Sequence, residues 1–382
     1  MSLLVVAGEA SGDRAAAAVI ARLPGVTSFG MGGGALRREG TELLVDLRTT
    51  TAMGVGEVAR RAYGVGMAWS KLRAAIHARQ PRAALLVNYT EFNARLAATL
   101  WKAGTRVLWY GAPQIWAWRP GRAIPLRKHL DRLAVMFPFE EALWRKHGVD
   151  AHYVGHPAVE EVREPEHRIA ARELMGVTPF CDAIALLPGS RPHEVRRLLE
   201  PMLDGFEMLR HERASIDARL LLASSLDDKT RSWARELCRT REVEVADVDA
   251  HAGIAYALPA FDAALCASGT ASLECALARV PPIVCYRVGW ATEAAARLLV
   301  DIPFVALPNI LLGRGAFPEL LQRDVDAGRI GDALAQVLDG KDAFLAACRE
   351  VDHALGDRRT PSLDVSRMLE PWLGHVSRTA SA

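Results

Sequence analysis

The 382-residue sequence has no long hydrophobic run and no basic leader pattern at its start. Its apolar stretches stay well short of the roughly 18 consecutive residues that a membrane-spanning helix needs. The first residues, MSLLVVAGEASGD, have the pattern of a strand and not that of a signal peptide. We therefore expect a cytoplasmic chain that folds from its first residues.

Cysteine is scarce, and its spacing shows no metal-binding pattern. The six cysteines contain no C-x-x-C pair, which disfavours both a zinc site and a disulfide framework. Two of them, Cys266 and Cys285, lie in apolar runs typical of buried strands. We expect free, buried thiols and no metal site.

The net charge of +2 is small, but the charge is unevenly distributed. Residues 1–165 carry 22 Lys and Arg against 14 Asp and Glu, a surplus of 8, whereas the remainder carries 25 against 31, a deficit of 6. A basic first half fits an anionic partner, such as a phosphate or an acidic membrane surface, and it equally fits charges scattered over solvated helices. Nucleic acid is disfavoured because the basic cluster at 119–132 is short and lacks aromatic stacking positions.

Short apolar runs alternate with longer amphipathic segments, which predicts an α/β fold with doubly wound parallel sheets. The length favours two domains. We place them at residues 1–165 and 166–355, followed by a C-terminal helix and tail at 356–382. The predicted strands are 2–8, 83–89, 106–112, 132–137 and 152–155 in the first half, then 183–189, 219–225, 243–247, 263–268, 281–288 and 304–309, and a helix is predicted at 194–212.

The first strand ends in AGEASGD, where Gly8 and Gly12 flank a turn that precedes an alanine-rich helix. With Ser11, such a turn offers backbone N–H groups to a phosphate or a sugar. It matches neither the dinucleotide G-x-G-x-x-G nor a Walker A loop. A plain strand-to-helix turn with Asp13 as the N-terminal cap is the alternative.

Residues 85–93, LLVNYTEFN, run from a short strand into a polar turn. Parallel sheets bind ligands at this end of a strand. Glu91 is the one carboxylate in the turn, because Asn88 cannot accept a proton at neutral pH. Glu91 is therefore a candidate base, and a solvated or helix-capping carboxylate is the alternative.

The second half has two phosphate-type loops. In LLPGSRPHEV, Gly189 and Ser190 lead to Arg191 at a helix N-terminus, which predicts a pyrophosphate site, with a capped helix and an exposed arginine as the alternative.

The second loop, CASGTASLECAL, repeats this arrangement. Ser268, Gly269 and Thr270 form the turn, and Glu274 stands one turn into the helix, where it is a candidate ligand of ribose hydroxyls. Asn309 in LPNILLGR is a candidate contact of the base or a phosphate, or a buried turn-stabilising amide.

The segment WYGAPQIWAWRPGR holds three tryptophans. We expect Trp109 in the core, whereas Trp116 and Trp118 lie on a proline-flanked loop, where they are candidates for a sugar-stacking surface.

Together these motifs resemble those of the lipid-A-disaccharide synthase family, inverting glycosyltransferases of the two-domain GT-B class. The similarity runs in order through residues 3–325: VVAGEASGD, AMGVGEV, APQIWAWR, FPFE, YVGHP, LLPGSR, ASGTASLECAL, YRV and LPNILLGR.

The resemblance implies transfer of 2,3-diacylglucosamine from UDP to 2,3-diacylglucosamine 1-phosphate, with no metal or other cofactor, by a protein bound peripherally to the inner membrane. The first domain would hold the acceptor glycolipid and the second the UDP-sugar donor, facing each other across a cleft. The resemblance also allows C-terminal helices that cross back, and a homodimer that exchanges C-terminal parts. The UDP site it implies comprises Gly189, Ser190, Arg191, Ser268, Gly269, Thr270, Glu274 and Asn309.

The sequence departs from the family at the presumed base. Members typically have D-x-P-D-F-N where this chain has Asn88, Thr90 and Glu91. The base is then Glu91, or a first-loop acid, Glu9 or Asp13, or the chain no longer catalyses transfer. In the region after the MG motif, which is apolar and membrane-facing in the family, this chain has small residues and two arginines at 60–61.

Two alternative functions therefore remain open from the sequence. One is a transferase or epimerase acting on a non-lipid UDP-N-acetylglucosamine-type substrate. The other is a diverged paralogue that binds a UDP-sugar or a lipid without transferring anything.

Overall fold

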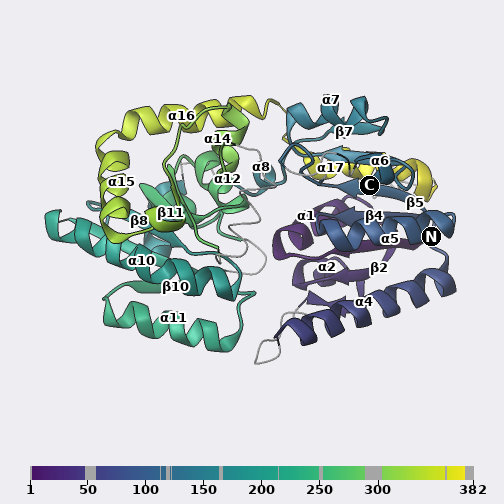
Figure 1. Ribbon diagram of the computed structural model, residues 1–382, viewed down its shortest axis with the longest axis horizontal. Helices are drawn as coiled ribbons and strands as arrows, with labels where there is room; N and C mark the ends of the chain where they lie inside the picture. Colours follow the sequence, from purple (N-terminus) through teal and green to yellow (C-terminus); the bar gives the residue numbers. More distant parts are fainter. Residues whose placement is uncertain are drawn as a thin grey trace, which may run out of the picture. The chain divides into compact units, whose positions relative to one another are not determined.

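The computed structural model describes residues 2–47, 57–111, 113–117, 121, 123–162, 167–213, 215–248, 253–288, 303–357 and 359–374, with only the backbone at 57–63. The chain divides into two compact units (Figure 1): Met1–Pro157 with Arg358–Ala382, and Ala158–Asp357. These breaks differ by a few residues from the boundaries at 165 and 355 proposed from the sequence. The expected membrane-facing segment after the MG motif lies largely outside the described residues.

The first unit contains a parallel seven-stranded sheet with the order β3-β2-β1-β4-β5-β6-β7. The parallel sheet confirms the sequence prediction. β2 and β3 were not predicted, because TSFGMG has two glycines and few branched residues, and ELLVD is only half-buried. The strands are β1 Ser2–Ala7, β2 Thr27–Gly32, β3 Glu42–Asp46, β4 Ala83–Val87, β5 Arg106–Tyr110, β6 Arg132–Val135 and β7 Ala151–Tyr153.

One face of this sheet packs on a core that includes Leu72, Leu96 and Trp144 of three helices. Trp109 of β5 is fully buried in the same core, which confirms its predicted role. The helices of the unit are α1 Ala10–Ala21, α2 Gly34–Arg38, α4 Glu57–Arg79, α5 Thr90–Lys102, α6 Ala123–Leu126, α7 Pro138–Lys146 and α17 Pro361–Leu373.

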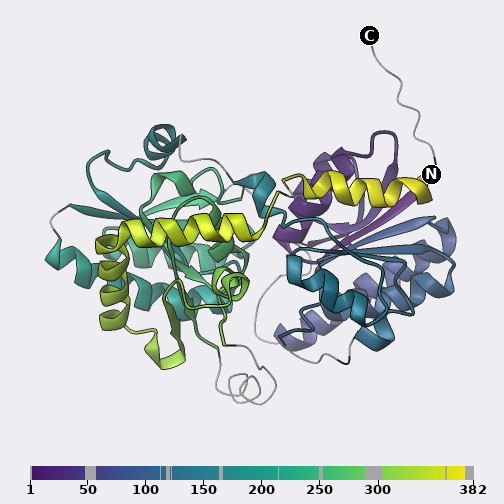
Figure 2. The same ribbon diagram turned by 90° about the horizontal axis from the view of Figure 1, so that it is seen from above.

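The C-terminal helix α17 returns to this first unit, where it packs against α1, β4 and β5 (Figure 2). The Arg132 guanidinium donates to the carbonyl of Met368 at 2.6 Å and lies 4.9 Å from the ring centroid of Trp372. The last helix therefore completes the N-terminal unit, as the resemblance allowed.

The second unit contains a parallel six-stranded sheet with the order β10-β9-β8-β11-β12-β13. The predicted strand at 304–309 is wrong: α14 begins at Leu307, with Pro308 in its first turn, where a missing N–H costs no hydrogen bond. The strands are β8 Asp182–Leu187, β9 Ile216–Ala223, β10 Glu244–Val248, β11 Ala263–Ala267, β12 Pro282–Tyr286 and β13 Glu319–Leu321.

Both faces of this sheet are covered. The predicted helix at 194–212 is confirmed as α10, which packs with α11 and α15 on one face, and α9 and α12 contribute to the core on the other. Cys266 and Cys285 are buried and free, as expected. The helices are α8 Ala158–Glu161, α9 Arg168–Met175, α10 Pro192–Glu212, α11 Asp228–Thr240, α12 Thr270–Leu277, α14 Leu307–Leu312, α15 Ala327–Asp339 and α16 Lys341–Ala354.

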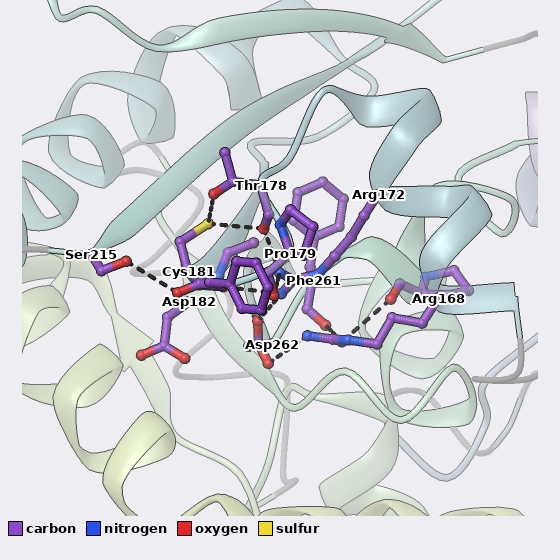
Figure 3. A network of polar contacts seen from close by, with 12 residues as sticks. Arg168, Arg172, Thr178, Pro179, Cys181, Asp182, Ser215, Phe261 and Asp262 are labelled. Carbon is purple, nitrogen blue, oxygen red and sulfur yellow. Dashed lines mark hydrogen bonds and ion pairs between the residues drawn. The ribbon is translucent and has the colours of Figure 1, made fainter.

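A buried carboxylate, Asp262, fixes the amino-terminal edge of this sheet (Figure 3). One oxygen contacts Arg168 at 2.9 Å and Lys341 at 2.5 Å, and the other accepts from Arg172 at 2.7 Å and from the Ala183 N–H at 3.1 Å. Arg172 also donates to the carbonyls of residues 178, 179 and 181. Burial acts to raise the pKa of Asp262, but the Lys341 hydrogen bond and the Arg168 charge outweigh it, so the pKa lies below its usual value.

Within the described part of the chain, no helix is both long and apolar enough to cross a membrane. The same residues contain no group of three His, Cys, Asp or Glu side chains arranged to hold a metal ion.

Candidate functional site

Each sheet has one topological switch point, between β1 and β4 in the first unit and between β8 and β11 in the second. At a switch point the connections leave neighbouring strands in opposite directions, and ligands bind in the crevice at the carboxyl ends. The segments that follow these four strands are the ones selected from the sequence: 8–13, 88–91, 189–191 and 268–270. The first turn is shorter than predicted, because α1 begins at Ala10 and already contains Ser11 and Gly12.

The turn between β4 and α5 interlocks with its two neighbouring loops. A Cβ atom on Gly8 would lie 2.1 Å from the Tyr89 ring, so that ring occupies the space a side chain would need. A Cβ atom on Gly111 would lie 2.1 Å from Asn88 Oδ1, and the Asn88 N–H donates to the Tyr110 carbonyl at 3.0 Å. The glycines therefore allow three loop segments to pack together around Asn88.

This turn has an unusual backbone. Asn88 and Tyr89 have φ values of 48° and 46°, a left-handed region that asparagine tolerates and tyrosine seldom adopts. The buried Asn93 amide donates to the carbonyls of Val87 at 3.3 Å and Asn88 at 2.9 Å, and Phe92 stacks on Tyr89 with ring centroids 5.2 Å apart. The surrounding contacts thus hold a strained conformation in place.

The three candidate carboxylates have different environments. Glu91 is exposed in the first turn of α5, and Glu9 is exposed at the N-terminus of α1. Asp13 is buried, and its oxygens accept the N–H groups of Gly33 at 2.6 Å and Ala35 at 2.9 Å. Asp13 therefore caps α2. The alternative interpretation, in which Asp13 caps its own helix α1, is wrong. Because both Asp13 oxygens are used in this cap, Glu91 or Glu9 is favoured as the base.

We expect Gly8→Ala to lower the free energy of unfolding by about 1–3 kcal/mol, because the new methyl group overlaps the Tyr89 ring. The double variant Gly8→Ala/Tyr89→Ala should show little additional loss beyond Tyr89→Ala. Gly64→Ala is the matched control: it lies in α4 with open space around its Cβ and should be neutral or stabilising. Urea unfolding measures all four variants, and equal effects of Gly8→Ala and Gly64→Ala would contradict the packing described.

In the second unit, the turn after β8 is built around a glutamate at the start of α10. Gly189 has a φ of 116°, and a Cβ there would lie 2.4 Å from Glu194 Oε2. Glu194 accepts the Arg191 N–H at 3.3 Å and its guanidinium at 2.8 Å. Burial and the Glu194 charge raise the pKa of Tyr286, and Arg191 acts in the opposite direction. Tyr286, at the end of β12, is thus a neighbour of this turn that we did not select from the sequence, although it belongs to the YRV motif.

The turn after β11 leads into α12. Ser268 Oγ donates to the Val305 carbonyl at 2.9 Å, so its hydroxyl hydrogen is used within the fold. Gly269, with a φ of 143°, is the N-cap of α12, and the space around its Cβ position is open. Thr270 begins the helix, and the Glu274 side chain is buried one turn later.

Asn309 has a structural set of contacts. Its amide donates to the Phe317 carbonyl at 2.9 Å and Glu319 at 2.8 Å, and its oxygen accepts the N–H groups of Ala316 and Phe317, both at 2.9 Å. These four bonds use the full capacity of the amide. They favour the turn-stabilising alternative over a direct contact with a nucleotide.

A model of the lipid-A-disaccharide synthetase family matches residues 3–357. The chain belongs to this family. It is 40% identical over 366 residues to the lipid-A-disaccharide synthase of Anaeromyxobacter dehalogenans, covering 94% of each chain. It is 38% identical over 375 residues to that of Myxococcus xanthus, covering 96% of this chain and 97% of the relative.

Solved structures resemble the fold at low sequence identity. MnaA from S. aureus, in a co-structure with UDP, matches with a TM-score of 0.68 and 10% identity, covering 96% of both chains. MurG from Acinetobacter baumannii matches with a TM-score of 0.55 and 13% identity, covering 96% of this chain and 99% of its own. The two parallel-sheet units therefore have the GT-B fold of glycosyltransferases.

The FPFE segment contains a buried acid, Glu140, that the sequence analysis did not select as a site residue. Glu140 accepts the Trp116 Nε1–H at 3.0 Å and the N–H groups of Met136 at 3.2 Å and Phe137 at 3.1 Å. Burial raises the pKa of Glu140 to about 7, although these hydrogen bonds act to lower it. Trp116 is thus anchored by a carboxylate that titrates near neutral pH, whereas Trp118 lies outside the described residues.

Glu140 should make stability depend on pH. Its pKa is higher in the folded chain than in the unfolded one, so the folded state holds the proton between about pH 4.5 and pH 7, and stability falls as the pH rises through that window. This pKa shift corresponds to a loss in the free energy of unfolding on the order of 3 kcal/mol between the two ends of the window. Unfolding free energies of wild type and Glu140→Gln at pH 5 and pH 8 measure it. We expect wild type to lose stability relative to the variant at pH 8, and parallel pH profiles would contradict the assignment.

Proposed function

We propose that this chain transfers 2,3-diacylglucosamine from UDP to the 6-hydroxyl of 2,3-diacylglucosamine 1-phosphate. The observation that carries the proposal is the family match over residues 3–357. It is supported by the sheet topology, because the loops suited to phosphates and sugars follow the strands at the switch points.

In this proposal the second unit binds the donor. Gly189, Ser190 and Arg191 hold the pyrophosphate at the N-terminus of α10, where the helix dipole and the guanidinium both favour negative charge. The amides at Gly269 and Thr270 provide a second phosphate contact, and Glu274 takes the ribose hydroxyls. MnaA, which shares this fold, was solved in a co-structure with UDP, and this supports a UDP-linked donor.

The first unit then binds the acceptor, with Glu91 as the base. Glu91 takes the proton of the acceptor 6-hydroxyl as its oxygen bonds to the donor anomeric carbon. The bond from that carbon to the UDP oxygen breaks with inversion, and UDP leaves with the electron pair. Arg191 stabilises the charge that develops on UDP. Asn88 orients the hydroxyl, and Gly8, Ser11 and Gly12 border the sugar.

The acyl chains of both substrates lead us to propose peripheral binding at the inner-membrane surface, by a protein that works without a nucleic-acid partner. The surplus of positive charge in residues 1–165 supports contact with anionic head groups. A homodimer belongs to the same proposal, without an exchange of the last helix, because α17 packs on the first unit of its own chain.

A second candidate is a protein that binds the UDP-sugar without transferring it. It is favoured by one observation, the Asn88 that stands where the family has its presumed base.

The test is mass spectrometry of reactions that contain the acylated donor and the 1-phosphate acceptor. The proposal predicts a tetra-acylated disaccharide 1-phosphate. Conversion of unacylated UDP-N-acetylglucosamine would instead favour an epimerase or a transferase for non-lipid substrates. Donor binding with no product would favour the second candidate.

A further inference from the structure

An aromatic pair, Trp116 and Phe139, lies on the ligand-facing edge of the first sheet. Trp116 is in the loop after β5, and Phe139 is in the first turn of α7, directly after β6. These parallel strands are neighbours, so both residues are at their carboxyl ends. The link to the proposed catalytic turn runs through Met136, whose N–H donates to Glu140: Met136 Cε and Asn88 Oδ1 lie 2.8 Å and 2.1 Å from the Cβ position of Gly111.

The two rings meet at a right angle. Their centroids are 5.5 Å apart, with an interplanar angle of 82°. The buried Phe137 ring stacks on Phe139 at 5.8 Å and 6°, and thereby supports it from the protein side. Trp116 is half-buried, and Phe139 keeps 38% of its surface exposed. The result is a rigid, solvent-accessible aromatic corner.

The indole N–H of Trp116, the polar group of this corner, already donates a hydrogen bond within the protein. Trp116 Nε1 donates to Glu140 Oε1 at 3.0 Å, and Glu140 is fixed in turn by the backbone N–H groups of Met136 and Phe137. The indole plane is therefore oriented, and only its carbon surface remains for a ligand. Such a surface recognises the apolar C–H face of a sugar ring.

We propose that Trp116 and Phe139 form the subsite that stacks on the glucosamine ring of the acceptor, and that Glu140 is the positioning residue for Trp116. This inference rests on the proposed function, which puts the acceptor in this unit. A ring is favoured over an acyl chain because the indole is held in one orientation at the same edge of the sheet as the proposed base. An acyl chain needs apolar area but no fixed plane, whereas a hydroxyl aimed at Glu91 needs a fixed ring.

Direct binding in the absence of donor tests the subsite. Calorimetry would use two probes, glucosamine 1-phosphate and a short-chain 2,3-diacylglucosamine 1-phosphate, with wild type, Trp116→Ala and Phe139→Ala. We expect each variant to bind both probes about 10-fold more weakly, by the same factor for each probe. Trp101→Ala is the matched control. Trp101 is 56% exposed near the end of α5, at the opposite edge of the sheet, and its loss should leave both affinities unchanged.

Glu140→Gln tests the positioning role. A glutamine oxygen can still accept the Met136 and Phe137 N–H groups, but its NH2 group would face the Trp116 N–H, so the anchor is lost. We expect a few-fold loss of affinity for both probes with an unchanged affinity for UDP, and Trp116→Phe should retain part of the binding that Trp116→Ala loses.

Two results would overturn the inference: unchanged affinities in Trp116→Ala and Phe139→Ala, or a loss confined to the acylated probe. If Trp116→Ala and Phe139→Ala bind both probes as wild type does, and wild type transfers the sugar, the subsite is rejected and the proposed function stands. If Trp116→Ala weakens binding of both probes but wild type transfers no sugar, the proposed transfer is rejected and the subsite stands.

Discussion

Glu91→Gln is expected to lower kcat about 10²- to 10⁴-fold with little change in KM for either substrate, because glutamine keeps the shape of the side chain but cannot accept a proton. Glu91 is exposed at the start of α5, so the substitution should leave the free energy of unfolding nearly unchanged. Steady-state rates of UDP release measure the first effect, and urea unfolding checks the second.

Asn88→Asp supplies the matched comparison. It places a carboxylate at the position where the resemblance predicts the base, on a backbone whose left-handed φ aspartate also tolerates. In the Glu91→Gln background it should recover part of the lost rate. Full activity in Glu91→Gln would exclude Glu91 as the base, and Glu9→Gln would then test the other exposed acid of this edge.

Asp262→Asn is expected to lower the free energy of unfolding by about 3–5 kcal/mol. The Asp262 carboxylate has 2% exposure and Arg172 has 6%, so the substitution leaves a buried guanidinium without its counter-charge. Asp339→Asn is the control, because Asp339 pairs with Arg213 at the surface, where such pairs contribute about 1 kcal/mol or less. Similar losses in both variants would contradict the structural role of Asp262.

The difference in the free energy of unfolding between wild type and Asp262→Asn should also depend on pH in a defined direction. The pKa of Asp262 is depressed in the folded chain, so its contribution is fully present above the ordinary value of 3.8 and is lost as the pH falls through the lower folded value. The gap between wild type and Asp262→Asn should therefore be constant from pH 5 to pH 8 and shrink in acid. A gap that widened in acid would contradict the assignment.

The sequence was sufficient for the fold class because most of the buried parallel strands are short apolar runs, as in ALLV of β4 and LLLA of β9. The sequence was insufficient to predict strands that form because they pair with neighbouring strands and not because of their own composition. TSFGMG of β2 is buried by its neighbours, and the three residues of β13 pair with β12 without a strand-like pattern of their own. The error at 304–309 has the same origin, since that apolar run starts a helix.

For the candidate site, the sequence located the loops but not the contacts within them. Asp13 and Asn309 have the composition of ligand-binding residues, yet their partners are backbone groups that only the folded chain brings near: the start of α2 for Asp13 and residues 316–317 for Asn309. The anchoring of Trp116 by Glu140, 24 residues later, is likewise a tertiary contact. The roles of Glu91, Arg191 and the phosphate loops stay predictions.

The most direct test of the transferase account is UDP release by the purified wild-type chain, given UDP-2,3-diacylglucosamine with and without 2,3-diacylglucosamine 1-phosphate. The account predicts release that depends on the acceptor and saturates with it. Tight donor binding with no release in the presence of acceptor, or release at the same rate without it, would contradict the proposal that this chain is a glycosyltransferase acting on acylated glucosamine.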